Sequence, residues 1–421
     1  MKNIKVFKFG GASLRDVDNI KNVSSILKKY ADDSLVIIVS AMGKTTNALE
    51  EVVASYFARD GKAFDILNKI KVNHYAIMDV LFDKNDDVYA HVNDTFVEVE
   101  WVLEDEPHDA YDYIYDQIVS VGEIVSSKIM SAYLNKVGLK TTWVDARDVL
   151  KTDETWRESI IHWESTIYNA QTQVKPLLES GGFVMTQGFI GSTKDNNTTT
   201  LGREGSDYSA SIFSHCLDAA GMYIWKDVPG VLSGDPRIFQ NVVKLDTIHY
   251  DEAIEMTYYG ATVVHPRTIQ PLMAKGIPLN VRSFVEHDAL GTIIGADAPP
   301  QYPPIFMAER NQIFLKFSNK DLTFLVESHI RDLFDIFTKY HIFVNLMQNS
   351  GAFFYISITH APDREREMMH ELRDKFNIEE IHNLDLFTIR HPNPSVIEEM
   401  KAGKRVVFEK TIPETYQVVL G

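Results

Sequence analysis

The feature that most constrains the fold is a repeated order of apolar, strand-like runs, each ending in a polar or glycine-containing loop before a helical pattern begins. Residues 35–39 are apolar throughout, as in a parallel strand covered on both faces. Further strand candidates are residues 2–9, 140–144, 183–186, 222–225 and 278–281. The alternation predicts α/β layers around a mainly parallel central sheet.

The ends of these runs predict where a ligand binds. Ligands of open α/β sheets lie beyond the carboxyl ends of the strands. Polar or glycine positions follow five such ends: Gly10, Ser40, Asp145, Gln187 and Asp227. We therefore expect one shared site built from distant parts of the chain.

The most informative loop is residues 198–211, which follow an apolar run and lead into a helical pattern. Gly202 and Gly205 free the backbone there, beside the polar side chains of Arg203, Ser206 and Asp207. A glycine loop that opens a helix presents backbone N–H groups and the helix dipole to an anion. The loop has neither the Walker lysine spacing nor the dinucleotide glycine spacing, so it predicts a phosphate or carboxylate site of another kind.

The charge balance and the cysteine content limit the kinds of partner and the cellular compartment that the chain fits. The chain has 42 Lys and Arg against 59 Asp and Glu, a net charge of −17, which argues against nucleic acid or an anionic membrane as partner. The single cysteine, Cys216, excludes an intrachain disulfide framework and is expected on a buried helix face. We expect a cytoplasmic protein, because no charged and apolar leader and no bilayer-length apolar run is present.

Length predicts at least two domains in these 421 residues. We expect a first domain over residues 1–295, with an acidic, mostly helical and solvated insertion at residues 60–118. Residues 296–304 contain four prolines and predict a linker. Residues 305–421 show the βαββαβ order of a ferredoxin-like unit, followed by a helix and two strands that indicate a second, incomplete unit.

Nine motifs, in their order and spacing, resemble aspartate kinases of the amino acid kinase family. They are residues 8–13, 40–47, 122–123, 145–147, 187–191, 200–207, 227–230, 235–237 and 265–267. Each motif is weak alone, but the set is specific and covers nearly the whole chain. The resemblance implies a three-layer amino-acid-kinase sandwich with a mainly parallel sheet, followed by tandem ACT-like regulatory units.

The resemblance also implies roles in catalysis and substrate binding. Lys8 would contact the transferring phosphate, and Asp207 would hold that lysine in place. Thr46, Glu123, Arg203 and Ser206 would bind L-aspartate. The chemistry agrees, because a guanidinium can grip a carboxylate through two hydrogen bonds and a carboxylate can receive the substrate ammonium. A general base is unnecessary, since the β-carboxylate is already ionised at neutral pH.

The resemblance implies Gly10, Gly11, Ser13, Asp227 and Arg237 as nucleotide-binding positions. We add Lys226, where relatives often carry threonine, because its charge can replace that of a family lysine missing at Thr262. ATP would bring its own Mg²⁺, held largely by phosphate oxygens and water, so we expect no dedicated metal site. In the regulatory region, Asn345 and Ser350 match a stretch that binds an amino-acid effector in regulated relatives. Asn345 stands where lysine-sensing members carry aspartate, so lysine is only slightly favoured over threonine as the effector.

The implied function is ATP-dependent phosphorylation of L-aspartate to 4-phospho-L-aspartate, the entry step towards lysine, threonine and methionine, by a monofunctional enzyme under feedback control. ACT units usually pair with a second copy, so a homodimer is expected. Glu204, Leu232 and Thr262 depart from the usual family pattern. They leave open a catalytically weak or inactive amino-acid sensor, and a kinase of another acidic amino acid is a further alternative.

Overall fold

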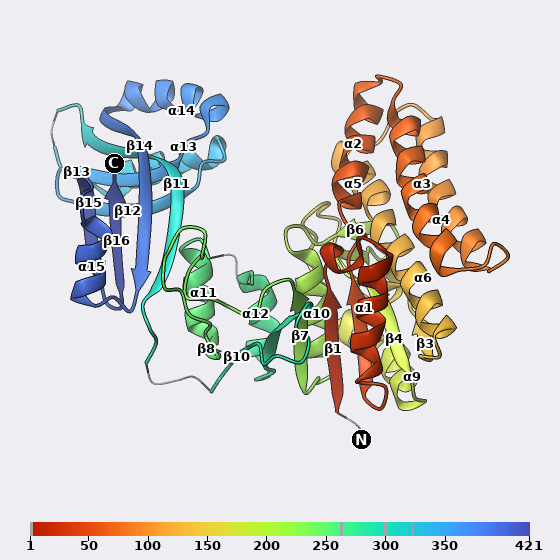
Figure 1. Cartoon of the computed structure of the whole chain (residues 1–421). Coiled ribbons are helices and arrows are strands. Elements are labelled where there is room, and N and C mark those ends of the chain that lie inside the picture. The colour runs from red at the N-terminus through yellow and green to blue at the C-terminus, as the bar shows by residue number, and fades with distance from the viewer. Residues whose placement is uncertain (1–2, 262–263, 298–300, 322) are drawn as a thin grey trace. The chain divides into compact units, whose positions relative to one another are not determined.

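The computed structural model describes residues 3–261, 264–297, 301–321 and 323–421, and the chain forms two compact units (Figure 1). The first unit contains Met1–Val231, Lys244–Ile254 and Val264–Ala298. The second contains Pro299–Gly421 together with Leu232–Val243 and Glu255–Val263. Two segments that precede the proline-rich stretch thus belong with the C-terminal unit. Among the described helices, none combines the length and apolar character needed to span a membrane.

The first unit is built on an eight-stranded sheet in the order β3-β4-β2-β1-β7-β9-β10-β8. The strands are β1 (Ile4–Phe9), β2 (Ser34–Val39), β3 (Thr141–Trp143), β4 (Phe183–Gln187), β7 (Gly221–Lys226), β8 (Thr247–His249), β9 (Leu279–Ser283) and β10 (Thr292–Gly295). All neighbours are parallel except β9 and β10, which are antiparallel. The six strands expected from the apolar runs are confirmed, and the sheet is mainly parallel as predicted.

Helices cover both faces of this sheet and complete the predicted three layers (Figure 1). On one face, α1 (Val17–Lys28) and α6 (Val121–Lys136) share a core with Phe7 and Phe9 of β1. On the other face, α10 (Gly205–Cys216) packs on β1, β2 and β7, and Cys216 is buried as expected. Because successive strand residues alternate between faces, Lys8 is directed towards α10 while its neighbours enter the opposite core.

Outside its acidic region, the remaining described helices and turns of the first unit are the 3₁₀ turn η1 (Gly11–Leu14), α2 (Thr45–Ala58), α7 (Ala146–Val149), α8 (Trp163–Asn169), the π-helical turn η2 (Ala170–Val174), α9 (Lys175–Glu179) and α12 (Pro266–Met273). Helix α11 (Tyr250–Tyr258) is divided between the two units after Ile254. The hairpin of β5 (Ile190–Ser192) and β6 (Thr198–Thr200) stands apart from the main sheet and leads into the glycine loop before α10.

The acidic region of the first unit folds as three helices, α3 (Ala63–Leu81), α4 (Val88–Glu104) and α5 (Tyr111–Val119), which gather with α2 beyond one end of the sheet (Figure 1). Leu67, Val92 and Phe96 are fully or almost fully buried and belong to the same core as β1. The helices therefore extend the core, and their surface alone is acidic and solvated.

The second unit contains a six-stranded sheet, in the order β12-β13-β11-β14-β16-β15, with antiparallel neighbours throughout. Its elements are β11 (Ile305–Asn319), α13 (Glu327–Lys339), β12 (Val344–Ser350), β13 (Phe353–Thr359), α14 (Pro362–Lys375), β14 (Phe376–Arg390), α15 (Pro394–Lys401), β15 (Val406–Ile412) and β16 (Thr415–Leu420). The predicted ferredoxin-like order is confirmed by the first six of them.

Two long strands join the successive ferredoxin-like units. The second half of β14 pairs with β16, and β16 pairs with β15. The first residues of β11, from Ile305 to Glu309, pair with that same half of β14. The second ferredoxin-like repeat, which begins in β14, thus lacks a strand after β16. The start of β11 takes the place of that strand in the sheet, although it comes before both repeats in the sequence.

Candidate functional site

A cavity of about 850 Å³ lies in the first unit where β1 and β2 end. All six of the predicted catalytic and substrate-binding residues line it, together with Ser40 and Lys226; the six are Lys8, Thr46, Glu123, Arg203, Ser206 and Asp207. They come from two strand ends, the first turns of α2 and α6, the loop and first turn of α10, and the end of β7. The parallel sheet thus brings together residues that are far apart in sequence.

Lys8 and Asp207 form the central ion pair of this cavity. Their Nζ and Oδ1 atoms are 2.6 Å apart, and their side chains are only 12% and 6% exposed. The contact is an ion pair rather than an aligned hydrogen bond. Asp207 lies in the first turn of α10, on the face of the sheet towards which Lys8 points. A buried counter-charge fixes the ammonium far better than an exposed one would.

Glu123 brings a second buried carboxylate to the cavity wall, from the first turn of α6. Its Oε1 accepts a hydrogen bond from the backbone N–H of Ala41 at 3.2 Å, whereas its buried Oε2 receives none from the described residues. Burial raises the pKa of Glu123 to about 8, against the opposing effects of the Ala41 N–H and the Lys8 charge. An unpaired buried oxygen of this kind can receive a cationic donor from a ligand.

Hydroxyl and guanidinium groups complete the substrate side of the cavity. Ser40 Oγ donates to Ser206 Oγ at 2.9 Å, which joins the end of β2 to the first turn of α10. This approach requires Gly188, because a Cβ there would lie 2.6 Å from the Cβ of Ser206. Arg203 is exposed and makes no hydrogen bond or ion pair with the described part of the chain. Thr46 and Arg203 both line the cavity.

The unusual Glu204 is accommodated by its backbone and by a helix end. Its φ of 55° is left-handed, a conformation in which glycine is ordinarily preferred. Its Oε2 accepts a hydrogen bond from the backbone N–H of His265 at 2.8 Å, at the N-terminus of α12. The positive end of the helix dipole therefore compensates this negative charge at the cavity wall.

The other two departures from the family pattern are Leu232 and Thr262. Leu232 is half-buried in the second unit, and Thr262 lies outside the described residues.

The sequence analysis missed a further set of cavity-lining residues, Glu50, Tyr115 and Arg157. The guanidinium of Arg157 lies 4.4 Å from the centre of the Tyr115 ring, and the Tyr115 hydroxyl donates to Glu50 at 2.6 Å. Behind them the fully buried Asp116 accepts hydrogen bonds from Thr200 Oγ1 at 2.6 Å and from the backbone N–H groups of Arg157 and Thr200 at 3.0 Å. Burial raises the pKa of Asp116 to about 6, although these donors oppose the shift.

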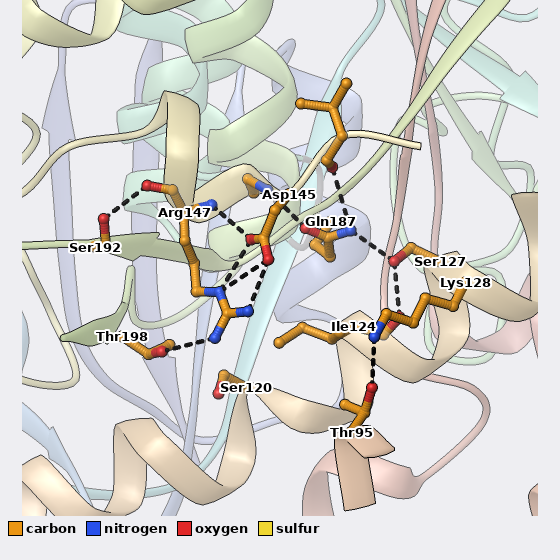
Figure 2. Close-up of polar contacts among 12 residues, drawn as sticks. Thr95, Ser120, Ile124, Ser127, Lys128, Asp145, Arg147, Gln187, Ser192 and Thr198 are labelled. Carbon is orange, nitrogen blue, oxygen red and sulfur yellow. Dashed lines mark hydrogen bonds and ion pairs between the residues drawn. The ribbon is translucent and has the colours of Figure 1, made fainter. Parts of the chain in front are cut away.

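Two residues expected at the shared site form a supporting network instead (Figure 2). Asp145 accepts from Arg147 Nη2 at 2.7 Å, and Arg147 Nη1 donates to Thr198 Oγ1 at 3.2 Å. Gln187 is fully buried, and its Nε2 donates to Ser127 Oγ at 2.6 Å. Neither Asp145 nor Gln187 lines the cavity. Of the five strand-end positions expected at one site, Ser40 alone lines the cavity. The side chains of Asp145 and Gln187 instead anchor β6 and α6.

Lys226, Asp227 and Arg237, three of the predicted nucleotide-binding residues, differ in whether they line the cavity. Lys226 lines the cavity, whereas Asp227 is exposed and does not line it. Arg237 belongs to a segment of the second unit, is 88% exposed and pairs with Asp235 at 2.6 Å. Their roles in binding nucleotide remain predictions.

The glycine pair after β1 provides a test of close packing. A Cβ at Gly11 would lie 2.7 Å from the carbonyl oxygen of Ala41 and 2.8 Å from that of Gly43. Gly11→Ala should therefore lower the free energy of unfolding by about 1–3 kcal/mol, measured by urea denaturation. Gly10→Ala is the matched control, because Gly10 has a φ of −77° and a Cβ there would meet nothing nearer than Lys8 Nζ at 3.6 Å. Equal stability of the two variants would contradict this account.

The predicted effector residues, Asn345 and Ser350, both lie in β12 of the second unit. Asn345 Nδ2 donates to Gln312 Oε1 at 2.9 Å and to Thr359 Oγ1 at 2.8 Å. Ser350 Oγ donates to the carbonyl oxygen of Phe353 at 3.3 Å. The amide of Asn345 is thus bonded within its own sheet, and the binding of an effector there remains a prediction.

Comparisons with known proteins agree with this geometry. The sequence profile of the Amino acid kinase family matches residues 3–283. The chain is 32% identical over 354 residues to lysine-sensitive aspartokinase 3 of Escherichia coli (strain K12), covering 83% of this chain and 77% of that protein. It is 35% identical over 298 residues to bifunctional aspartokinase/homoserine dehydrogenase 1 of Arabidopsis thaliana, covering 69% of this chain but only 32% of that protein.

Solved structures show the same likeness over both units. The structure of E. coli aspartokinase III in complex with lysine and aspartate has a TM-score of 0.85 at 26% identity, covering 99% of this chain and 95% of that one. The structure of the same enzyme with aspartate and ADP has a TM-score of 0.81 at 25% identity, covering 99% and 96%. The chain therefore belongs to the amino acid kinase family and, within it, to the aspartokinases.

Proposed function

We propose that the protein transfers the γ-phosphoryl group of ATP to the β-carboxylate of L-aspartate, giving 4-phospho-L-aspartate and ADP. The observation that carries the proposal is that one cavity contains both the buried Lys8–Asp207 ion pair and the buried carboxyl group of Glu123. The Oε2 atom of Glu123 has no hydrogen-bond donor among the described residues. The ammonium of Lys8 suits a transferring phosphate, and the Glu123 carboxylate suits the ammonium group of a substrate.

The chemistry then follows from positioning and charge. A β-carboxylate oxygen attacks the γ-phosphorus, and the bond from that phosphorus to the bridging oxygen of ADP breaks. Charge spreads over the equatorial phosphoryl oxygens, where the ammonium of Lys8 stabilises it. Glu123 receives the substrate ammonium, Arg203 binds a carboxylate, and the hydroxyls of Thr46 and Ser206 complete the pocket. ATP and its Mg²⁺ enter as substrates.

Two parts of the proposal concern control and assembly. The relative from E. coli is named as lysine-sensitive, and one of its structures contains lysine. These relatives support feedback control of this chain through its ferredoxin-like units, with lysine as the first effector to test. A homodimer remains a prediction, as does a cytoplasmic location.

An ADP-release assay with a panel of acceptors tests the proposed reaction. With Mg-ATP supplied, L-aspartate should stimulate ADP release, whereas glutamate and N-acetylglutamate should leave it near the rate without acceptor. Hydroxylamine should trap the acyl phosphate as aspartyl hydroxamate, which identifies the product. Folded protein that releases no ADP with aspartate would favour the amino-acid sensor, and release with glutamate would favour another acidic substrate.

The KM for aspartate should fall as the pH rises from about 6 to about 8 and then level off. Burial holds the pKa of Glu123 at about 8 in the unliganded protein, so below this pH the carboxyl group is mostly protonated. Binding of the substrate ammonium must then release that proton, which weakens binding by up to about tenfold per pH unit. Glu123→Gln should bind aspartate weakly and without this pH dependence. A wild-type KM that is constant over the range would contradict the assigned role.

A further inference from the structure

Two histidines and a glutamate from three separate elements of the second unit form a cluster, and none of them lines the proposed catalytic cavity. His360 follows β13, Glu365 lies in the first turn of α14, and His382 lies within β14. One side-chain ligand atom from each residue lies within 4.8 Å of the other two. No role proposed so far uses any of these residues.

The first two members are fixed relative to each other. Glu365 Oε2 lies 2.7 Å from His360 Nδ1 and accepts from the backbone N–H of Ala361 at 3.4 Å. The Glu365 side chain is only 11% exposed. The backbone N–H of His360 donates to the carbonyl oxygen of Asn311 at 2.9 Å, which anchors the loop to β11. A carboxylate oxygen and an imidazole nitrogen held this close share a proton in the metal-free protein, and both are groups that bind a metal ion once that proton is released.

A β-bulge places the third member of the cluster. Ile381 pairs with Phe314 and Leu384 pairs with Gln312, so two residues of β14, His382 and Asn383, face a single residue of β11. Asn383 has a left-handed φ of 57°. Bulges of this kind redirect side chains and recur beside functional sites.

The bulge lets His382 approach His360 although β11 lies between their strands in the sheet. The two rings are 6.2 Å apart between centroids and nearly perpendicular, at 88°. His382 Nε2 also lies 3.4 Å from Glu380 Oε2, so a carboxylate stands beside each of the two imidazoles.

We propose that His360, Glu365 and His382 bind a divalent transition metal ion of the zinc class. Two imidazoles and one carboxylate are a ligand set that suits such ions, with a fourth position left for water. Metal–ligand bonds of about 2.0–2.2 Å place ligand atoms about 3.3 Å apart in a tetrahedral site. The ligand atoms, now within 4.8 Å of one another, must therefore move closer, and the 42% exposed side chain of His382 is not enclosed on every side. The ion displaces the proton that joins His360 to Glu365.

Titration of the full chain with Zn²⁺ against a chromophoric chelator, without ATP or aspartate, tests the site. The wild type should bind one equivalent per chain, and Co²⁺ in its place should give the visible absorption of a tetrahedral site. His382→Ala should weaken Zn²⁺ binding by at least about 100-fold, since even residues that only support a metal ligand are worth 10–100-fold. Its far-UV circular dichroism should be unchanged, because the side chain is partly exposed.

His370→Ala is the matched control, since His370 also lies in the second unit, on α14, beside a carboxylate. Its Nδ1 lies 4.0 Å from Asp374 Oδ2, and its side chain is 85% exposed. This contact joins one histidine to one carboxylate, whereas the proposed site has two histidines. This variant should bind Zn²⁺ like the wild type. The proposal is overturned if folded wild type takes up no Zn²⁺, if His382→Ala takes up as much as the wild type, or if His370→Ala loses it equally. None of these outcomes depends on the proposed kinase activity.

Discussion

Lys8→Met is expected to lower kcat for ADP release with aspartate by about 10³-fold. The transferring phosphoryl group concentrates negative charge on its equatorial oxygens, and removing one fixed donor from such a site typically costs 10²–10³-fold or more. The fold holds the Lys8 ammonium firmly, because its Nζ lies 2.6 Å from Asp207 Oδ1 and its side chain is only 12% exposed. The measurement is steady-state ADP release at saturating ATP and aspartate.

Folding must be separated from chemistry in this test. Lys8→Met leaves the carboxylate of Asp207 buried without its counter-charge, so the free energy of unfolding should fall by several kcal/mol. Lys8→Arg keeps the charge but moves it, so it should stay folded and still lose most of the activity. Lys5→Met is the control on the same strand, since Lys5 pairs with Asp33 at 2.8 Å outside the cavity. A Lys8→Arg variant with wild-type kcat would contradict the assignment of Lys8.

The sequence predicted the fold more completely than the direction of individual side chains. A run such as Leu35 to Val39 is apolar on both faces, so it identifies a central parallel strand without reference to any partner. A strand end fixes where a residue lies at the edge of the sheet, but hydrogen bonding decides where its side chain points. Asp145 and Gln187 therefore turn away from the cavity, towards Arg147 and Ser127, while Ser40 lines it.

The residues that were missed depend on contacts between distant segments. Asp116 belongs to an acidic helical region whose composition predicts a solvated surface, yet it is fully buried because Thr200, 84 positions away, and the backbone of Arg157 both donate to it. His382 becomes a neighbour of His360 only through a bulge in strand pairing. Composition and periodicity carry no information on such a register shift, so the sequence predicted no metal-binding residues there.

Asp207→Asn should lower kcat by about 10²-fold, and the double variant Lys8→Met/Asp207→Asn should show how Asp207 acts. Asp207 lies in the first turn of α10 with a side chain only 6% exposed, opposite the ammonium of Lys8. If Asp207 acts by positioning Lys8, its replacement costs nothing further once Lys8 is gone, so the double variant should have the kcat of Lys8→Met alone.

The free energy of unfolding and kcat should fall together in each single variant and diverge only in the double variant. Each single variant leaves one buried charge unpaired, whereas the double variant removes both charges and leaves two neutral groups of similar volume. The double variant should therefore regain most of the unfolding free energy lost in Lys8→Met while remaining inactive. Asp218→Asn is the control, because Asp218 pairs with Lys275 in an exposed position and should affect neither quantity. Multiplicative losses of kcat in the double variant would mean that Asp207 contributes independently of Lys8, through its own contact with a substrate.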